Sequence, residues 1–422
     1  MTPIPRRQFL FTGAVGLAGL AFSGRLGAAT PPGPSDIGPV PLTPVGPPPV
    51  PVAAKASADV ADVPSPAAWP AEKRIGFAIV GLGGLAHDQL LPAFSLSKRA
   101  RIAGLVSGSP EKASAVAGQY GVKQDSVYGY DEWERIAQNP DIDAVYLAVP
   151  NSLHAQYTFL AAKAGKHVLC EKPMATSAIE AQQMIDACAQ ASRKLMVAYR
   201  CQYEVFNRAL IDLVRQNLLG QVGLIEACNV QSIGNPLQWR LKKALSGGGS
   251  LPDLGLYCVN SARAVLGEEP FEVSARVWNP PNDPRFSEVE DTMAFTLRFP
   301  GGALVNCSSS YSLHRSQSLR VYGTQGWAEL ENAFAYRGPR LIVHGKDGTK
   351  EITTEPTLEF QNPFALELDH FASCIVRDVK PYTPGEEGLQ DHRIMEALYQ
   401  SARMGRTAAL AFPPATRGPA PI

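Results

Sequence analysis

Residues 75–86 read IGFAIVGLGGLA, an apolar run that passes directly into a glycine-rich turn. The run has the length and composition of a strand that is buried in a parallel sheet. Gly81 permits a tight turn, Gly83 lets a phosphate group approach the backbone, and the small Ala86 allows a helix to pack closely on the strand. A purely structural glycine turn is the alternative, and the surrounding elements decide between the two.

Short apolar runs alternate with amphipathic stretches on the C-terminal side of this turn. From residue 74 to about 198 we predict strands at 76–80, 101–106, 144–149, 167–170 and 194–198, and helices at 89–97, 110–120, 152–164 and 178–191. This alternation predicts an α/β domain at residues 73–198, a Rossmann domain with a doubly wound parallel sheet. The glycine turn then joins the first strand to the first helix, and predicts a dinucleotide site that includes Gly81, Leu82, Gly83, Gly84 and Leu85.

After about residue 200 the pattern changes to strand-like segments with few helices between them. We predict strands at 223–231, 271–278, 292–299, 303–309, 318–323 and 327–331, and helices at 204–216, 364–377 and 388–404. These elements predict a second domain of the α+β type at residues 199–412, with a large open, mostly antiparallel sheet. We assign this domain to substrate binding and oligomerisation, and residues 413–422 to a C-terminal tail.

The N-terminus has the features of an export signal. Arg6 and Arg7 precede an apolar stretch from Phe9 to about Phe22, and small residues follow at 27–29. This pattern predicts a twin-arginine-type signal over residues 1–30 and a periplasmic protein, with a Sec signal or an uncleaved anchor as the alternative. Because the stretch is short and rich in glycine, we expect no stable membrane insertion after the signal is removed.

Residues 31–72 form a proline-rich segment with almost no helix or strand periodicity. Thirteen of the 36 prolines lie between Pro31 and Pro70. This composition favours a solvated spacer, partly in the polyproline II conformation. An arm that docks on a neighbouring subunit is the alternative interpretation.

Charge and cysteine content bear on which partners the chain can have. The chain has 39 Lys and Arg against 39 Asp and Glu, so no strong net field recruits nucleic acid. No pair of its seven cysteines has Cys-x-x-Cys spacing. We therefore expect neither a metal site nor an obligatory disulfide.

The end of the second predicted strand bears on the choice of cofactor. An NAD site usually has Asp or Glu there, whereas this chain has Ser107, Gly108 and Ser109, with Lys112 one turn into the next helix. The serine hydroxyls can donate to a 2′-phosphate and the lysine can neutralise it, so we predict NADP. Both serines can also serve as caps of the helix, and the two roles are compatible.

Two further segments carry the proposed chemistry. Glu171-Lys172-Pro173 ends a predicted strand, which places Lys172 at the carboxyl edge of the sheet, where ligands bind. Asp253 and Tyr257 are four residues apart and share one face of a predicted helix. A phenol next to a lysine ammonium is expected to have a lowered pKa and to transfer protons more readily. The alternatives are a surface lysine, an N-terminal helix aspartate and a core tyrosine.

Several other residues are weaker candidates, each with an ordinary packing or surface role as the alternative. His154 follows Pro150 and Asn151 and is a candidate neighbour of the nicotinamide. We assign to cofactor binding, besides the glycine turn and residues 107–112, the set Pro150, Asn151, His154, Glu171, Lys172, Arg200, Trp239 and Arg240. We assign to substrate binding Lys172, Tyr203, Arg240, Asp253 and Tyr257.

These segments together resemble the glucose–fructose oxidoreductase branch of the Gfo/Idh/MocA family, over nearly everything from residue 74 to 406. The motifs that carry the resemblance are Gly81-Leu82-Gly83, Val106-Ser107-Gly108, Pro150–Ala155, Glu171–Thr176, Tyr199-Arg200-Cys201, Gln238–Leu241, Gly247–Tyr257 and Pro384–Gly388. The resemblance implies catalysis at Lys172, Asp253 and Tyr257. It also implies a tightly bound NADP, and a proline-rich arm that embraces the partner subunit of a homodimer or homotetramer.

The expected function is therefore a periplasmic sugar oxidoreductase in which NADP stays bound. One aldose, such as glucose, is oxidised to its lactone, and a second sugar, fructose or another aldose, is reduced to the alditol in a ping-pong cycle. One alternative is an NADP-dependent aldose dehydrogenase whose cofactor dissociates. Another, of a different class, is a non-catalytic sugar- or nucleotide-binding protein, which the presence of Lys172, Asp253 and Tyr257 disfavours.

Overall fold

The computed structural model of the 422-residue chain describes residues 68–410 and Arg417. The predicted signal at 1–30, nearly all of the proline-rich segment at 31–72 and all of the tail except Arg417 lie outside the described residues. All described residues belong to one compact unit of the chain.

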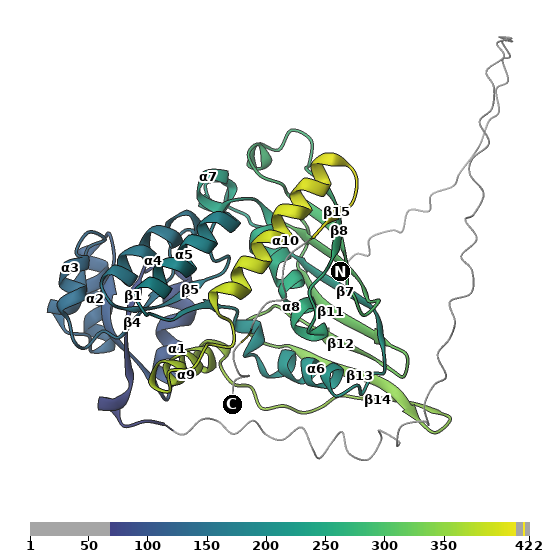
Figure 1. Ribbon diagram of the computed structural model, residues 1–422, viewed down its shortest axis with the longest axis horizontal. Coiled ribbons are helices and arrows are strands. Elements are labelled where there is room, and N and C mark those ends of the chain that lie inside the picture. Colours follow the sequence, from purple (N-terminus) through teal and green to yellow (C-terminus); the bar gives the residue numbers. More distant parts are fainter. Residues whose placement is uncertain (1–67, 411–416, 418–422) are drawn as a thin grey trace, which may run out of the picture. The chain divides into compact units, whose positions relative to one another are not determined.

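A six-stranded parallel sheet forms the first half of this unit (Figure 1). Its order is β3-β2-β1-β4-β5-β6. The chain adds β2 and β3 on one side of β1 and then β4, β5 and β6 on the other, so the strand order reverses between β1 and β4. The strands are β1 (Ile75–Val80), β2 (Ala100–Val106), β3 (Val127–Tyr128), β4 (Ala144–Leu147), β5 (His167–Glu171) and β6 (Leu195–Ala198). The helices are α1 (Leu91–Leu96), α2 (Pro110–Tyr120), α3 (Trp133–Gln138), α4 (His154–Lys163) and α5 (Ala178–Gln190). The predicted doubly wound α/β domain is confirmed, and β3 and α3 are additions to it.

A nine-stranded sheet forms the second half, in the order β14-β13-β12-β11-β7-β10-β9-β8-β15. Its pairings are antiparallel except for β7 with β10, which are parallel. The strands are β7 (Val222–Val230), β8 (Glu272–Trp278), β9 (Thr292–Arg298), β10 (Leu304–Ser310), β11 (Ser316–Gly323), β12 (Trp327–Glu331), β13 (Arg340–Asp347), β14 (Lys350–Thr354) and β15 (Ala408–Ala409). The helices are α6 (Val205–Arg215), α7 (Lys243–Ser246), α8 (Leu256–Leu266), α9 (Pro363–Val376) and α10 (Gly385–Met404). The mostly antiparallel sheet is confirmed, and the sequence prediction missed β13, β14 and β15.

Helix α9 packs against the first sheet, although its residues fall within the second predicted domain. The ring of Phe371 lies 6.2 Å from that of Phe77 on β1. Asp369 accepts hydrogen bonds from the Ser97 hydroxyl at 2.6 Å and from the main-chain N–H of Arg99 at 2.8 Å. Figure 1 shows α9 beside α1. The chain therefore returns to the nucleotide half after it has built the second sheet.

An Asp369→Ala substitution is expected to lower the free energy of unfolding by about 1–3 kcal/mol, because it leaves buried donors unpaired. Chemical denaturation measures this change. Glu351→Ala is the control, because the side chain of Glu351 is 75% exposed in its pair with Lys346. A midpoint for Asp369→Ala equal to that of the control would show that this anchor contributes nothing to stability.

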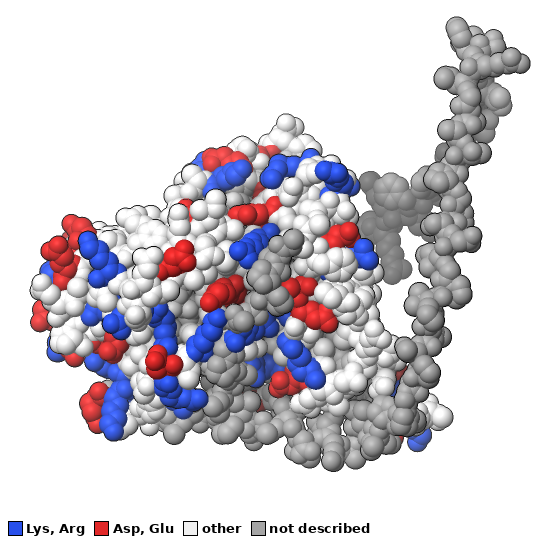
Figure 2. All heavy atoms as spheres, viewed as in Figure 1, with Lys and Arg blue, Asp and Glu red and all other residues white. Residues whose placement is uncertain are grey.

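The surface charges, the cysteines and the helices of the described residues have the features of an ordinary globular protein. Lys and Arg are interspersed with Asp and Glu on the face shown in Figure 2. All seven cysteines are free, and six of them are buried. Within the described part of the chain, no helix is both long and apolar enough to span a bilayer.

Candidate active site

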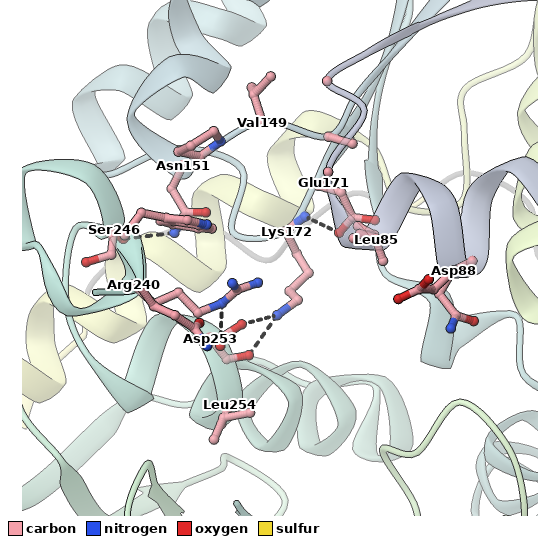
Figure 3. A pocket seen from close by; sticks show the side chains of 18 of the residues that line it. Leu85, Asp88, Val149, Asn151, Glu171, Lys172, Arg240, Ser246, Asp253 and Leu254 are labelled. Carbon is pink, nitrogen blue, oxygen red and sulfur yellow. Dashed lines mark hydrogen bonds and ion pairs between the residues drawn. The ribbon is translucent and has the colours of Figure 1, made fainter. Parts of the chain in front are cut away.

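A cavity of about 860 Å³ lies between the carboxyl ends of the first sheet's strands and the second domain (Figure 3). Residues that follow β1, β2, β4 and β5 line one side, and the segments around β7, α8 and β11 line the other. The side chain of Asn151 joins the two sides, because its amide donates to the Ser246 carbonyl at 2.8 Å. The cavity thus occupies the position at which parallel α/β sheets bind ligands.

The glycine turn fits a dinucleotide. Gly81 has a φ of +97°, and a Cβ at this position would lie 2.5 Å from the carbonyl oxygen of Ala148. Only glycine meets both conditions without strain. A Cβ on Gly83 would meet no protein atom within 4 Å, so its backbone faces open space in the cavity. These two positions have the roles that a pyrophosphate-binding turn requires.

A Gly83→Val variant is expected to fold normally but to bind little or no nucleotide, because its side chain would fill the space that a pyrophosphate needs. Gly118→Val is a matched control, because a Cβ at Gly118 also meets no atom within 4 Å, and it lies on α2 away from the cavity lining. Nucleotide content after denaturation and the melting temperature are the measurements. Full nucleotide content in Gly83→Val would contradict this role of the turn.

The residues after β2 suit a phosphorylated ribose. Ser107 accepts a hydrogen bond from the main-chain N–H of Ser109 at 3.1 Å. Ser109 is the N-cap residue of α2, but its side chain makes no capping bond, so its hydroxyl stays available to a ligand. The ammonium of Lys112 donates to the carbonyl of Leu82 and so reaches across to the glycine turn. Gly108 does not line the cavity but lies behind it, against the ring of Tyr130.

Lys172 and Asp253 form the centre of the cluster in Figure 3. The Nζ of Lys172 donates to the main-chain oxygen of Asp253 at 2.7 Å and to its Oδ1 at 3.0 Å. The other carboxylate oxygen accepts from Arg240 Nε at 3.0 Å and from the Tyr311 hydroxyl at 2.9 Å. Burial alone would raise the pKa of Asp253, but Lys172, Arg240 and the Tyr311 hydroxyl together hold it below its ordinary value. Asp253 is therefore a fixed carboxylate.

Tyr257 departs from the sequence expectation. Lys172 Nζ lies over the face of its ring, 4.5 Å from the centroid, and the guanidinium of Arg200 lies 5.3 Å from the same centroid. Burial raises the pKa of Tyr257, and the opposing effect of Arg200 does not offset it. The prediction of a lowered pKa was wrong, because the lysine meets the ring and not the hydroxyl. Tyr257 is a neutral phenol at neutral pH.

Arg200 and His154 line the cavity, and main-chain oxygens contact both terminal nitrogens of the arginine and both ring nitrogens of the histidine. Arg200 donates to the carbonyls of Phe334 and Ala335, and its guanidinium lies 4.5 Å from the ring centroid of Tyr336. The two ring nitrogens of His154 lie 2.9 and 3.0 Å from the carbonyls of Pro173 and Val149. Burial lowers the pKa of His154 despite these carbonyls. Both residues therefore hold the loops of the site in place.

The structure brings most predicted site residues to this one cavity. They are Gly81, Leu82, Gly83, Gly84, Leu85, Ser107, Ser109, Lys112, Pro150, Asn151, His154, Glu171, Lys172, Arg200, Trp239, Arg240, Asp253 and Tyr257. Gly108 and Tyr203 are the exceptions, since neither lines the cavity. Tyr203 is 2% exposed and its hydroxyl lies 3.0 Å from that of Thr383, so the prediction that it binds substrate was wrong. Sequence reasoning missed Tyr311, Asn229 and Gln317, which also line the cavity. No local signal marks Tyr311, since its partner Asp253 is 58 residues away.

A dinucleotide turn lies at the point where the strand order of the Rossmann sheet reverses, and Lys172 follows β5 of the same sheet. Asp253 and Tyr257 of the second domain complete the cluster. This arrangement defines an NAD(P)-dependent oxidoreductase. Residues 75–199 match the oxidoreductase family with an NAD-binding Rossmann fold, and residues 207–329 match the GFO/IDH/MocA C-terminal domain. The chain belongs to the Gfo/Idh/MocA family, which confirms the resemblance found in its sequence.

Three relatives are informative. The crystal structure of an aldose–aldose oxidoreductase from Caulobacter crescentus, complexed with glycerol, is 44% identical, with a TM-score of 0.77 over 80% of this chain and 100% of that one. D-xylose 1-dehydrogenase (NADP(+)) from Haloarcula marismortui is 32% identical over 80% of this chain and 93% of its own length. D-xylose 1-dehydrogenase (NADP(+)) 2 from Haloferax volcanii is 30% identical over 79% of this chain and 99% of its own length.

Proposed function

We propose that this chain is a sugar oxidoreductase with a resident NADP, which oxidises an aldose such as glucose to its lactone and reduces a second sugar to the alditol. The similarity to the Caulobacter aldose–aldose oxidoreductase supports this function and favours an aldose over fructose as the acceptor. The NADP-linked xylose dehydrogenases support the cofactor and the sugar substrate. The proposal extends to a periplasmic homodimer or homotetramer, for which the twin-arginine-type N-terminus and the family resemblance are the support.

The observation that carries the proposal is the Lys172–Asp253–Tyr257 cluster beside the nucleotide turn. An ammonium has three N–H donors, and Asp253 takes two of those of Lys172, which leaves one for a substrate oxygen. Asp253 fixes the ammonium in this position, and Arg240 and Tyr311 fix Asp253. The neutral phenol of Tyr257 is suited to give a proton to the carbonyl of the acceptor sugar. Bound NADP would supply the hydride acceptor and donor.

The ping-pong cycle follows from export. An enzyme outside the cytoplasm meets no NADP pool, so a cofactor that dissociated would end turnover. A cofactor that is loaded before export and retained must be recycled in place by a second sugar. The alternative is an NADP-dependent aldose dehydrogenase that releases its cofactor, which the named activity of the xylose dehydrogenases favours.

The test uses the full-length protein, purified without added nucleotide. After gel filtration we expect one NADP per chain, and addition of glucose is expected to produce the absorbance of the reduced nucleotide. A second aldose or fructose then reoxidises it, and product analysis identifies the lactone and the alditol. Nucleotide-free protein that turns over only when NADP is added would establish the dehydrogenase alternative. Failure of every sugar to reduce supplied NADP would refute the oxidoreductase function.

A Lys112→Met variant is expected to bind NADP about 10- to 100-fold more weakly, with unchanged affinity for NAD, because a charge-assisted contact is worth roughly 1.5–3 kcal/mol. Calorimetric titration of nucleotide-stripped protein measures both affinities. Lys123→Met is the control, because Lys123 is 71% exposed and pairs with Asp141 outside the cavity. Equal losses for NADP and NAD would show that Lys112 does not read the 2′-phosphate.

A further inference from the structure

Three acidic side chains form a row that runs from the cavity into the core. The hydroxyl of Tyr146 on β4 lies 2.9 Å from Oε1 of Glu171 and 3.5 Å from Oε2 of Glu367 on α9. Glu171 lines the cavity, whereas Tyr146 and Glu367 are completely buried. Oε2 of Glu171 accepts from the main-chain N–H of Lys172 at 3.1 Å. The row therefore starts directly behind the lysine of the site.

Glu367 is the protonated member of the row. In the described part of the chain no ion pair reaches it, and its Oε1 has no hydrogen-bond partner. An isolated buried carboxylate is strongly disfavoured, so Glu367 keeps a proton. Tyr146 has a single phenolic proton, and its 2.9 Å contact directs that proton to an ionised Glu171, because 3.5 Å is long for an O–H···O bond.

Charged and titratable groups around the row agree with this distribution. Burial raises the pKa of Glu367 well above its ordinary value, and the neighbouring Glu171 raises it further, while Arg200 and the Tyr146 hydroxyl oppose. Cys201 and Tyr203 also face Glu367, and their own pKa values are raised. Burial likewise raises the pKa of Glu171, but Lys172, Tyr146 and Arg200 lower it. Glu171 is the member of the row that has cations beside it on the cavity side.

The other groups of the cavity are poor proton acceptors. Tyr257 already has its proton, and Asp253 is held ionised by three side chains. Burial lowers the pKa of His154, although the two main-chain carbonyls that face its ring nitrogens oppose this effect. Glu171 is a carboxylate whose burial makes it more basic than an ordinary one, and it lines the same cavity as Tyr257.

We propose that Glu171 accepts the hydroxyl proton of the donor sugar and retains it, with Tyr146 and Glu367 behind it, until the acceptor sugar takes it up. The inference rests on the proposed two-sugar function. As the donor carbon is oxidised, its O–H electron pair forms the carbonyl, and bound NADP would take the C–H pair as a hydride. The proton passes to the oxygen of Tyr257 while the phenol gives its own proton to Glu171, which becomes a neutral carboxyl. The reductive half reverses each transfer, so no proton needs to leave the protein.

The first experiment measures protons in a single half-reaction. Protein with its NADP is mixed with glucose alone in weakly buffered solution containing a pH indicator. We expect much less than one proton released per nucleotide reduced in the wild type. Glu171→Gln is expected to reduce its nucleotide about 10²- to 10⁴-fold more slowly and to release one proton per nucleotide reduced. The rate of the wild type is expected to fall at low pH, as Glu171 becomes protonated. The rate of Glu171→Gln is expected not to show this fall. Glu204→Gln is the control, because Glu204 is a buried carboxyl outside the cavity lining.

Infrared difference spectra provide a readout that does not depend on turnover. The resting protein is expected to show a protonated-carboxyl stretch that Glu367→Gln removes. Addition of glucose is expected to produce a second such signal, which is absent from Glu171→Gln. Release of one proton per reduced nucleotide by the wild type, with no second carboxyl signal, would overturn the inference and leave the two-sugar function intact. Absence of any nucleotide reduction would instead refute the proposed function.

Discussion

A Lys172→Met variant is expected to lose about 10²- to 10³-fold in the rate of nucleotide reduction by sugar, which is the effect of removing one positioned hydrogen-bond donor from the reacting oxygen. The ammonium is the hydrogen-bond donor that Asp253 holds at 3.0 Å and that has one N–H left for the substrate. Methionine keeps the length and much of the packing of the side chain but donates nothing. Stopped-flow absorbance in the oxidative half-reaction measures the loss.

The loss must be separated from a loss of structure or of cofactor. Because Arg240 and Tyr311 still contact Asp253, the carboxylate keeps partners in the variant, and we expect a similar melting temperature and a full complement of nucleotide. Lys346→Met is the matched control, because Lys346 is 64% exposed on β13 and pairs with Glu351. A Lys172→Met protein that holds its nucleotide and is reduced at the wild-type rate would remove Lys172 from the mechanism.

The first sheet could be predicted because its strands are buried on both faces and therefore appear as continuous apolar runs. Phe77, Ala78, Ile79 and Val80 of β1 are all 0% exposed. Strands β3 and β15 have two residues each, which is too short for a periodic signal. The hairpin of β13 and β14 is half exposed and polar, but its two-residue turn, Gly348-Thr349, begins with glycine and is a hairpin signal that could have been found.

The site could be predicted where local spacing determines geometry, and not where distant segments meet. Asp253 and Tyr257 are four residues apart on one helical segment, whereas Tyr311, which contacts Asp253, is 58 residues away from it in the sequence. Tyr203 follows Arg200 by three residues, but the short helical turn between them directs it to the core beside Thr383. Proximity in a sequence motif also does not show how deeply a side chain is buried, and burial decided the pKa of Tyr257.

An Arg263→Met variant is expected to lose about 3–5 kcal/mol of unfolding free energy, the effect of removing one partner from a buried ion pair. Arg263 is completely buried on α8, the helix that carries Tyr257. Its guanidinium donates to Asp391 at 2.6 Å, to Glu387 at 3.2 Å and to both oxygens of Glu269 at 2.7 Å. Glu387 and Asp391 are almost completely buried, so the variant leaves two carboxyl groups away from water without their shared cation. Urea denaturation measures the loss.

The pH dependence of this loss identifies its cause. Burial already raises the pKa of Asp391 to about 6 in the wild type, and removal of Arg263 raises it further. A carboxyl whose folded pKa exceeds its unfolded value binds protons more readily in the native state, so stability increases as pH falls toward about 4. The difference between Arg263→Met and the wild type should therefore narrow at low pH. Arg417→Met serves as the comparison. Arg417 is 16% exposed and pairs with Glu387 but not with Asp391 or Glu269, so this variant should lose less free energy of unfolding. A loss in Arg263→Met that is independent of pH would point to packing, and not to charge, as the contribution of this residue.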